Sequence, residues 1–470
     1  MNRPAGILLR SWDRRFRGRL DRICRRGEIA GRGVEARVAR IIATVRRRGD
    51  AAIVALTRRY DGVALGRGRI ELPRSAMVAA ARAVPPRVLA DLRLAARRIA
   101  AFHRRQRERS WRYRDAAGLV LGQKIEALGR VGVYVPGGRA VYPSSVLMNV
   151  VPARVAGVGQ VVVVSPPRPG GYDPAILAAA HVAGVDAFYQ VGGAQAVAAL
   201  AYGTETIPAV DKVVGPGNVY VATAKRLVFG RVGIDLLAGP SEVLVVADGS
   251  AEAELVAADM LAQAEHDELA AAVCLTPDAR LAARVMDELG AQLGELPRHR
   301  IARRALENFG AVVVTRSLSE AVEIANAIAP EHLELAVRRP GQWVGKIRHA
   351  GAVFVGHGTP EALGDYLAGP NHVLPTSGSA RFASPLGVYD FVKRTSVIVG
   401  GPTALRRLGP AVERLAALEG LDAHRLAVRR RLARGVQRRS PRTRPARRRR
   451  LRVGRRPRAK AARAGRDGRI

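Results

Sequence analysis

The sequence predicts an α/β protein built from two Rossmann-like parallel-sheet units. The first observation is a set of short β-branched runs, which are typical of strands buried on both faces. The second is that Ala-rich helical segments, such as 173–184 and 193–202, lie between several of these runs. Strands alternating with helices at this spacing form parallel sheets covered by helices. The predicted strands are 131–135, 161–165, 187–191, 243–247, 311–315 and 352–355.

These patterns divide the chain into six segments. The two α/β units span 130–237 and 238–380. The remaining segments are a basic N-terminal arm (1–34), a helical region (35–129), a C-terminal helical segment (381–428) and a basic tail predicted to be disordered (429–470).

Composition excludes a membrane or secreted protein. No apolar run approaches the roughly 20 residues that a membrane helix needs, and the "GILL" near the start is too short for the apolar core of a signal peptide. The two cysteines, Cys24 and Cys274, have neither CxxC nor zinc-ribbon spacing. We therefore expect free thiols and a cytoplasmic location.

The net charge of +38 raises the possibility of a nucleic-acid partner. However, residues 429–470 hold 20 basic residues and one acidic residue, which is half of that charge. The tail also lacks the interleaved aromatic residues of single-strand binders. Any nucleic-acid binding is therefore expected to be non-specific and confined to the tail.

Four glycine-containing loops follow or precede the predicted strands, where folds of this type bind ligands. Glycine lets the backbone approach a ligand closely, although each loop alone could be a tight turn. The usual dinucleotide fingerprint is absent, because no G-x-G here continues to a third glycine in a strand–turn–helix context. The loops are "PGGRAVYPS", "VGGAQA", "VGPGNVY" and "AGPSE".

Two similar strings, "AEHDEL" (264–269) and "PEHLEL" (330–335), contain candidate chemistry. The first ends a predicted helix, 251–266, which we expect to be capped by Ser250 and to bury Leu255, Met260 and Leu261. Asp259, Gln263 and His266 share one face of this helix. That face could be solvated, or Gln263 and His266 could hold a metal ion together.

The second string lies beyond the end of a helix. Residues 317–329 form a predicted helix that begins at Ser317 and stops at Pro330. Glu331 and His332 then lie at the start of an extended segment. A Glu and a His in a cleft suit general acid–base chemistry.

Two further clusters, "GDYLAGPNHVLPT" and "EGLDAH", supply more candidate ligands. Two nitrogens and two oxygens are an acceptable zinc set. The spacing in the sequence alone does not show that these side chains meet in the fold. The candidate set is Gln263, His266, Asp365 and His424.

Taken together, longer strings resemble one known family, the histidinol dehydrogenases, over about residues 35–430. They are "VGVYVPGG", "PSSVLMNVVPARVAGV", "VGGAQAVAALAYGTETIPAVDKVVGPGN", "DLLAGPSEVLVVAD", "DMLAQAEHD", "APEHLEL", "GDYLAGPNHVLPT" and "LEGLDAH".

This resemblance implies an NAD-dependent, zinc-requiring enzyme of the last steps of histidine biosynthesis. It would oxidise L-histidinol twice, through a bound aldehyde, to L-histidine. It also implies an intertwined homodimer with shared active sites and one Zn²⁺ per subunit.

The resemblance further implies a role for individual positions. The zinc ligands would be Gln263, His266, Asp365 and His424, with His424 supplied by the partner subunit. The acid–base pair would be Glu331 and His332. NAD contacts would be Tyr134, Gln195 and Asn218. Substrate contacts would be Ser241, Gln263, His266, His332, Asp365, Glu419 and His424.

Two questions stay open at this point. A dehydrogenase of the same family could act on another amino or sulfonated alcohol. The tail 429–470 departs from the family pattern, and it could be a disordered extension or an out-of-frame translation of a GC-rich gene.

Overall fold

The computed structural model describes residues 4, 6–26, 33–137 and 142–433. The chain divides into a large unit, Met1–Ser110 with Gln123–Thr395, and a small unit, Trp111–Gly122 with Ser396–Ile470. Within the described residues, no helix has the length and apolar character to cross a membrane.

The first sheet of the large unit has six strands, and all neighbours are parallel except the short β2 beside β7. Its central strands are buried on both faces: Val161, Val162, Val163 and Val164 are all 0% exposed. Burying such a side chain contributes roughly 1.5–3 kcal/mol. The strand order is β2 (Glu71–Leu72), β7 (Ala187–Gln190), β6 (Gln160–Ser165), β5 (Arg130–Tyr134), β8 (Lys212–Val214) and β9 (Gly233–Ile234).

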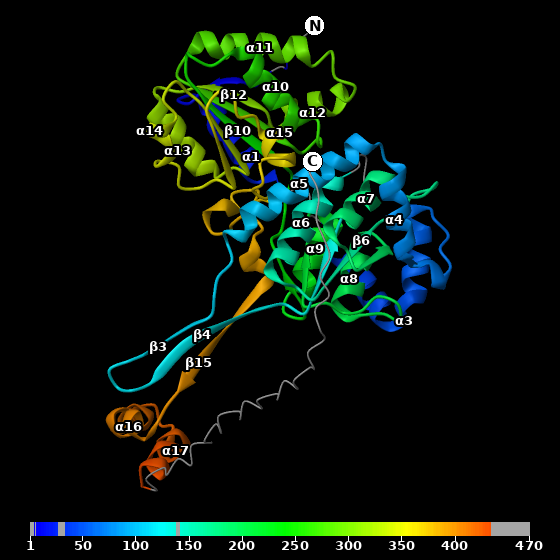
Figure 1. The fold of residues 1–470 in the computed structure, drawn as a ribbon. Helices are drawn as coiled ribbons and strands as arrows, with labels where there is room; N and C mark the ends of the chain where they lie inside the picture. The colour runs from blue at the N-terminus through cyan, green and yellow to red at the C-terminus, as the bar shows by residue number, and fades with distance from the viewer. Residues whose placement is uncertain (1–3, 5, 27–32, 138–141, 434–470) are drawn as a thin grey trace, which may run out of the picture. The chain divides into compact units, whose positions relative to one another are not determined.

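Helices cover both faces of this sheet because successive side chains of a strand point to opposite sides. Val161 and Val163 pack in one core with one set of helices, while Val162 and Val164 pack in another core with a second set (Figure 1). The first set is α4 (Arg74–Ala83), α5 (Pro86–Arg104), α6 (Pro143–Ala156) and α7 (Pro174–Ala183). The second set is α3 (Glu35–Asp61), α8 (Gly193–Tyr202) and α9 (Val219–Val228).

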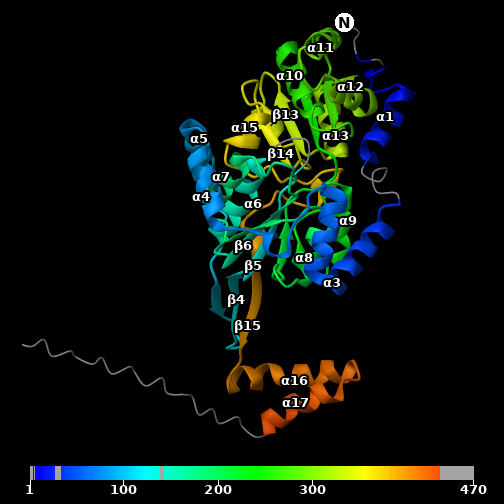
Figure 2. The same ribbon diagram turned by 90° about the vertical axis from the view of Figure 1, so that its right-hand side faces the viewer.

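The second sheet is fully parallel and is likewise covered on both faces (Figure 2). Its order is β1 (Leu8–Arg10), β12 (Ala311–Val314), β11 (Ala271–Thr276), β10 (Glu242–Ala247), β13 (His332–Ala336) and β14 (Ala352–Val355). One face packs on α10 (Ala253–Ala264), α11 (Ala279–Gln292) and α12 (His299–Phe309). The other packs on α1 (Arg14–Cys24) and α13 (Leu318–Ile328).

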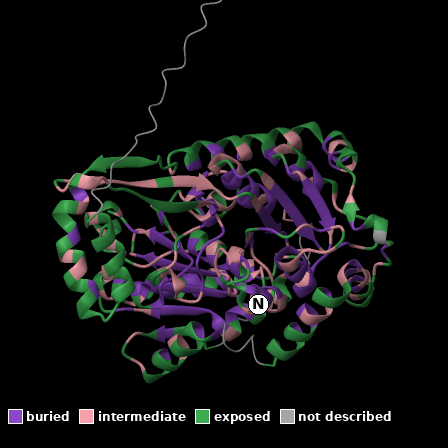
Figure 3. Ribbon diagram, turned by 90° about the horizontal axis from the view of Figure 1, so that it is seen from below, coloured by how far each residue is buried: buried purple, intermediate pink, exposed green. Residues whose placement is uncertain are grey.

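The two-sheet architecture expected from the sequence is confirmed, and the six predicted strands agree with observed ones to within one residue at either end. Figure 3 shows the strands of both sheets as buried and the outer faces of many helices as exposed. The pattern did not predict β11, nor β1 within the basic N-terminal segment. Leu8–Arg10 pairs with β12, so this part of the arm belongs to the second sheet.

The helix 251–266 differs from the expectation in two details. It begins at Ala253 after Glu252, without a side-chain cap, because the Ser250 hydroxyl bonds to Asp248 instead. Leu255 is 44% exposed, whereas Met260 and Leu261 are buried as expected. The inward face of the helix is therefore rotated toward Gln263, which is buried.

The small unit contains two helices that pack closely where Gly409 of α16 lies against Val428 and Leu432 of α17. They are α16 (Pro402–Leu418) and α17 (Asp422–Ala433). Helix α17 continues five residues into the segment predicted to be a disordered tail, and the rest of that prediction, 434–470, lies outside the described residues.

The remaining described elements are a three-stranded sheet and five short helices. A three-stranded sheet has the order β15 (Val392–Val399), β4 (Val120–Ala127) and β3 (Trp111–Arg114). The short helices are η1 (Arg67–Arg69), α14 (Gly341–Val344), α15 (Glu361–Tyr366), η2 (Ser379–Arg381) and η3 (Val388–Phe391).

Candidate active site

Two cavities of the large unit contain most of the residues singled out from the sequence. The large cavity, of about 630 Å³, is lined by Tyr134, Gln195 and Asn218, the three expected NAD contacts. The small cavity, of about 150 Å³, is lined by Ser241, Gln263, His266, Glu331, His332 and Asp365. The Gly-Pro-Gly-Asn loop takes part in both, since Pro216 lines the small cavity and Asn218 the large one.

The large cavity lies where strands of the first sheet end and helices begin. Tyr134 ends β5, and its hydroxyl accepts a hydrogen bond from the Gly193 N–H at 3.0 Å, at the start of α8. Asn218 caps α9 by accepting from the N–H groups of Tyr220 and Val221. Helix N-termini favour phosphate groups. The cavity therefore has the position and polarity for a nucleotide.

Gly215 allows this arrangement because its φ is +105°, and a Cβ atom there would lie 2.2 Å from the Tyr134 carbonyl oxygen. No other residue type could bring the loop this close to β5 without strain.

The Glu331–His332 pair is placed by the end of α13. The helix is capped by Ser317, which accepts from the Glu320 N–H, and it stops at Ala329 in a left-handed conformation with φ +53°. His332 then begins β13, as the sequence predicted.

Both members of the pair are held by the backbone of one residue, Glu242, at the start of β10. The Glu242 N–H donates to Glu331 Oε2 at 2.9 Å. His332 Nδ1 lies 3.1 Å from the Glu242 carbonyl oxygen. A carbonyl only accepts, so Nδ1 carries the proton and the neutral ring has its free lone pair on Nε2.

The electrostatics of the pair keep the His332 ring uncharged. Burial lowers the pKa of His332 to about 4, although Asp365 opposes the decrease. The ring is therefore neutral near pH 7. Its Nε2 is buried and has no hydrogen-bond partner among the described residues. Burial also raises the pKa of Glu331 well above its ordinary value, which brings this carboxyl group toward the range where proton transfer is efficient.

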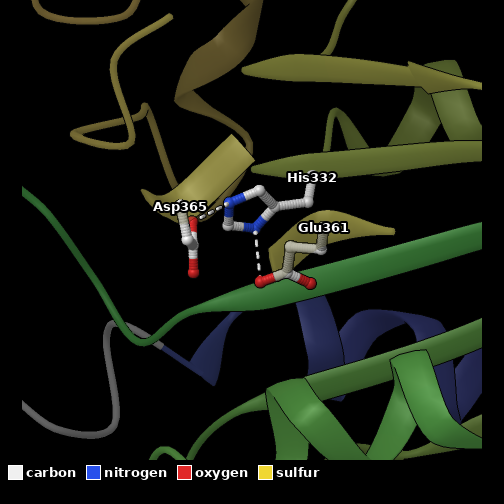
Figure 4. A group of neighbouring side chains, drawn as sticks. All are labelled: His332, Glu361 and Asp365. Carbon is white, nitrogen blue, oxygen red and sulfur yellow. Dashed lines mark ion pairs between the residues drawn. The ribbon is translucent and has the colours of Figure 1, made fainter. Parts of the chain in front are cut away.

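Glu361 is a site residue that the sequence analysis missed. It is 3% exposed, and its Oε1 lies 3.5 Å from His332 Nδ1, while Asp365 Oδ1 lies 3.8 Å from His332 Nε2 (Figure 4). Burial, and then Asp365, raises the pKa of Glu361 well above its ordinary value. The available signal was the four-residue spacing of Glu361 and Asp365, which places both on one helix face.

The donor atoms for a metal ion gather at the same place. Ligand atoms of His332, Glu361 and Asp365 all lie within 4.8 Å of one another. Gln263 is 1% exposed, and with its amide nitrogen as donor it bonds to Glu361 Oε1 at 2.8 Å. Its amide oxygen then remains as an acceptor. Together with the half-buried His266, this donor set suits zinc.

The structure thus brings three of the four expected zinc ligands, Gln263, His266 and Asp365, to one cavity. The fourth, His424, and the expected substrate contact Glu419 belong to the small unit, where both are exposed. Asp259, on the same helix face as Gln263, is half-buried and bonds to Glu334. That face is therefore partly buried and not a solvated stripe.

The fold and the site together define an α/β enzyme with a nucleotide-sized cavity beside a pocket of buried imidazole and carboxyl groups. Residues 24–432 match the histidinol dehydrogenase family. The chain is similar to the histidinol dehydrogenase of Syntrophotalea carbinolica, with 54% identity over 416 residues, 88% of this chain and 96% of that protein. It is also similar to that of Pseudomonas syringae pv. tomato, with 49% identity over 90% of this chain and 95% of the other.

A solved structure gives the same result. The crystal structure of histidinol dehydrogenase from Elizabethkingia anophelis superposes with a TM-score of 0.82 at 35% identity, over 85% of this chain and 92% of that one. The chain belongs to the histidinol dehydrogenase family and is an oxidoreductase of histidine biosynthesis.

Proposed function

We propose that this chain oxidises L-histidinol with NAD⁺ in two steps, through L-histidinaldehyde retained in the small cavity, to L-histidine. The observation that carries the proposal is the buried Glu331–His332 pair, with His332 Nε2 free as a base beside Gln263, His266 and Asp365. An alcohol and a hydrated aldehyde both need a base before hydride can leave, and this pair supplies it.

The two members of the pair have separate roles. His332 Nε2 takes the hydroxyl proton of the alcohol, and later that of the hydrated aldehyde. Glu331 takes a proton from the water that adds to the aldehyde. For this it must be ionised, so its raised pKa limits the rate at low pH. Ser241, which also lines the cavity, orients the substrate through its hydroxyl group.

The large cavity is the proposed NAD⁺ site, with Tyr134, Gln195 and Asn218 as contacts. When bound there, NAD⁺ would accept the hydride of each oxidation. Pro216 and Asn218 belong to one loop and line the small and the large cavity, so this loop connects the proposed substrate and cofactor sites.

The proposed Zn²⁺ site has Gln263, His266 and Asp365 as its ligands from one subunit. A zinc ion bound by these residues would supply a Lewis acid for the imidazole and amine of the substrate. His332 is assigned to proton transfer through Nε2, while its Nδ1 donates to the Glu242 carbonyl.

The fourth ligand, His424, and the substrate contact Glu419 are proposed to come from the partner subunit of a homodimer. Both are exposed in the small unit. Helix α16 also exposes large apolar side chains, with Leu415 61% and Leu418 83% exposed. Exposed apolar surface of this kind is typical of an interface. Cys24 and Cys274 are free thiols, consistent with the cytoplasm as the working compartment.

The direct test is an assay of the purified, zinc-loaded chain with L-histidinol and NAD⁺. Two NADH and one histidine per histidinol consumed would support the proposal. A same-family dehydrogenase of another amino or sulfonated alcohol would instead turn over that alcohol and leave histidinol untouched.

Mixed dimers test the shared site. Chains carrying His424→Ala and chains carrying His332→Asn are each expected to be inactive. Mixing them creates one intact site per heterodimer if His424 acts across the interface. No recovery of activity on mixing would place His424 in the site of its own subunit.

A further inference from the structure

Arg26 is a fully buried arginine next to exposed ones. It is 0% exposed, whereas Arg22 and Arg25 are exposed. A buried guanidinium group is costly unless its charge is paired and its N–H groups are hydrogen-bonded. Its partners therefore indicate why it is buried.

Two of those partners, Pro240 and Glu242, are the neighbours of Ser241, which lines the small cavity. Arg26 Nη2 donates to the Pro240 carbonyl at 2.9 Å and lies 3.2 Å from Glu242 Oε2, while Nη1 donates to the Ile23 carbonyl at 2.7 Å. Pro240 and Glu242 flank Ser241, the expected substrate contact. Arg26 therefore binds the Gly-Pro-Ser-Glu segment on both sides of that serine.

Glu242, which Arg26 holds, in turn contacts both members of the acid–base pair. Its N–H holds Glu331 and its carbonyl holds His332. Its own carboxylate is held by Arg26 and by the Ser377 N–H. One residue with a fixed side chain thus orients both groups that the reaction needs.

The N-terminal segment that delivers Arg26 is itself fixed to the second sheet. Strand β1 pairs with β12, and Arg19 of α1 donates to the Gly310 carbonyl at 2.9 Å and to the Asn308 carbonyl at 3.1 Å, at the C-terminal end of α12. Arg26 is not one of the described residues that line the small cavity. Arg26 can therefore affect the reaction in this cavity only through the residues that it contacts.

We infer that Arg26 is a positioning residue for the proposed reaction, which holds Glu242 so that Glu331 and His332 keep their orientation. The N-terminal basic segment then has a defined function, to supply a buried cation behind the catalytic pair. This inference rests on the proposed function.

The charges around Glu331 affect its pKa, and a change that altered packing alone would leave this pKa unchanged. The groups facing it are Glu242 on β10, His332 on β13, Glu361 and Asp365 on α15, and Arg26 after α1. Burial raises the pKa of Glu331. Glu242 and Asp365 raise it further, and Arg26 lowers it. Removing Arg26 and removing the charge of Glu242 should therefore move this pKa in opposite directions.

The experiment compares Arg26→Met and Glu242→Gln in the full, zinc-loaded chain, with the exposed neighbour Arg25→Met as the matched control. Arg26→Met should lower kcat about 10- to 100-fold, the scale expected for a displacement near 1 Å, with the histidinol KM changed by less than about threefold. The acid limb of its kcat–pH profile should move to higher pH. In Glu242→Gln the limb should move to lower pH.

Arg26→Lys restores the cation, so its acid limb should return to the wild-type position. Arg25→Met should match wild type throughout. A folded Arg26→Met enzyme with wild-type kcat and an unmoved acid limb would overturn the inference. If Arg26→Met does not fold, an unmoved limb in Glu242→Gln overturns it equally. In either case, wild-type oxidation of histidinol would show that the proposed function itself stands.

Discussion

The two six-stranded sheets of this chain have the same doubly wound architecture but very different cavities. The large cavity of the first sheet is lined mainly by prolines, glycines, tyrosines and amides, and its charged residues are Arg37, Asp61 and Arg168. The small cavity has about a quarter of its volume and gathers three histidines and three carboxyl groups. The volume of the first cavity suits a large ligand, and the histidines and carboxyl groups of the second suit proton transfer and metal binding.

This comparison teaches that the fold alone does not decide the chemistry. In the first sheet Tyr134 ends a strand and Asn218 caps a helix, whereas in the second sheet His332 begins a strand. The titratable content of the two cavities also differs. Variants of the large cavity should therefore change cofactor binding, and variants of the small cavity should change kcat or metal content.

The largest effect is expected at His332. His332→Asn should lower kcat about 1,000- to 10,000-fold, because it removes the free lone pair of His332 Nε2 that takes the substrate proton. Its zinc content should stay at the wild-type level, measured by atomic absorption, whereas His266→Asn should lose zinc. Zinc loss in His332→Asn with retention in His266→Asn would assign the metal to the His332–Glu361–Asp365 group instead.

Glu361→Gln should weaken zinc binding about 10- to 100-fold, the usual cost of losing a residue that orients a ligand. The reason is that Gln263 bonds to the Glu361 carboxylate in the preferred amide orientation. Competition with a chelator measures the change, and the exposed Glu323→Gln on α13 is the control. Equal zinc affinity in both variants would remove Glu361 from the metal site.

In the large cavity, Asn218→Asp separates helix capping from cofactor binding. The aspartate can still accept from the Tyr220 and Val221 N–H groups, so thermal stability should be retained. Its charge should repel the dinucleotide phosphates and raise the NAD⁺ dissociation constant about tenfold, by analogy with like-charge effects at interfaces. Calorimetric titration checks this, and an unchanged constant would place the phosphates elsewhere.

The smallest effect concerns stability. Burial raises the folded-state pKa of Glu331 above its unfolded value, so the folded state binds more protons in that interval. Stability from this group is present at low pH and is lost as pH rises through the folded pKa. Glu331→Gln should therefore raise Tm by roughly 2–4 °C at pH 8 and by less at pH 5. An equal Tm shift at both pH values would contradict the raised pKa.

Much of the fold could be predicted from the sequence because many of its strands are marked by short runs of β-branched residues. A run such as 161–164 consists of four valines buried on both faces, so its composition and its burial both indicate a strand. The exceptions have physical reasons. Leu8–Arg10 is only three residues long and lies among arginines, and its strand conformation depends on pairing with β12.

The site was predictable where the residue types were distinctive. Glu331 and His332 stood out because Pro330 ends a helix before them. The likeness of the two Glu-His strings was misleading, since we propose that His266 of the first acts with Gln263, whereas Glu331 and His332 of the second act as a pair. Glu361 and Arg26 were missed because an acid in the first turn of a helix, or an arginine in a basic segment, is ordinarily solvated. Only their burial distinguishes them.

The most direct test of the central claim is the amount of NADH formed per histidinol by Glu331→Gln in a single turnover. If Glu331 activates the water for the second oxidation, the wild type should form two NADH per histidinol, and Glu331→Gln should form one and stop at the aldehyde. Two NADH at the wild-type rate in Glu331→Gln would contradict the account.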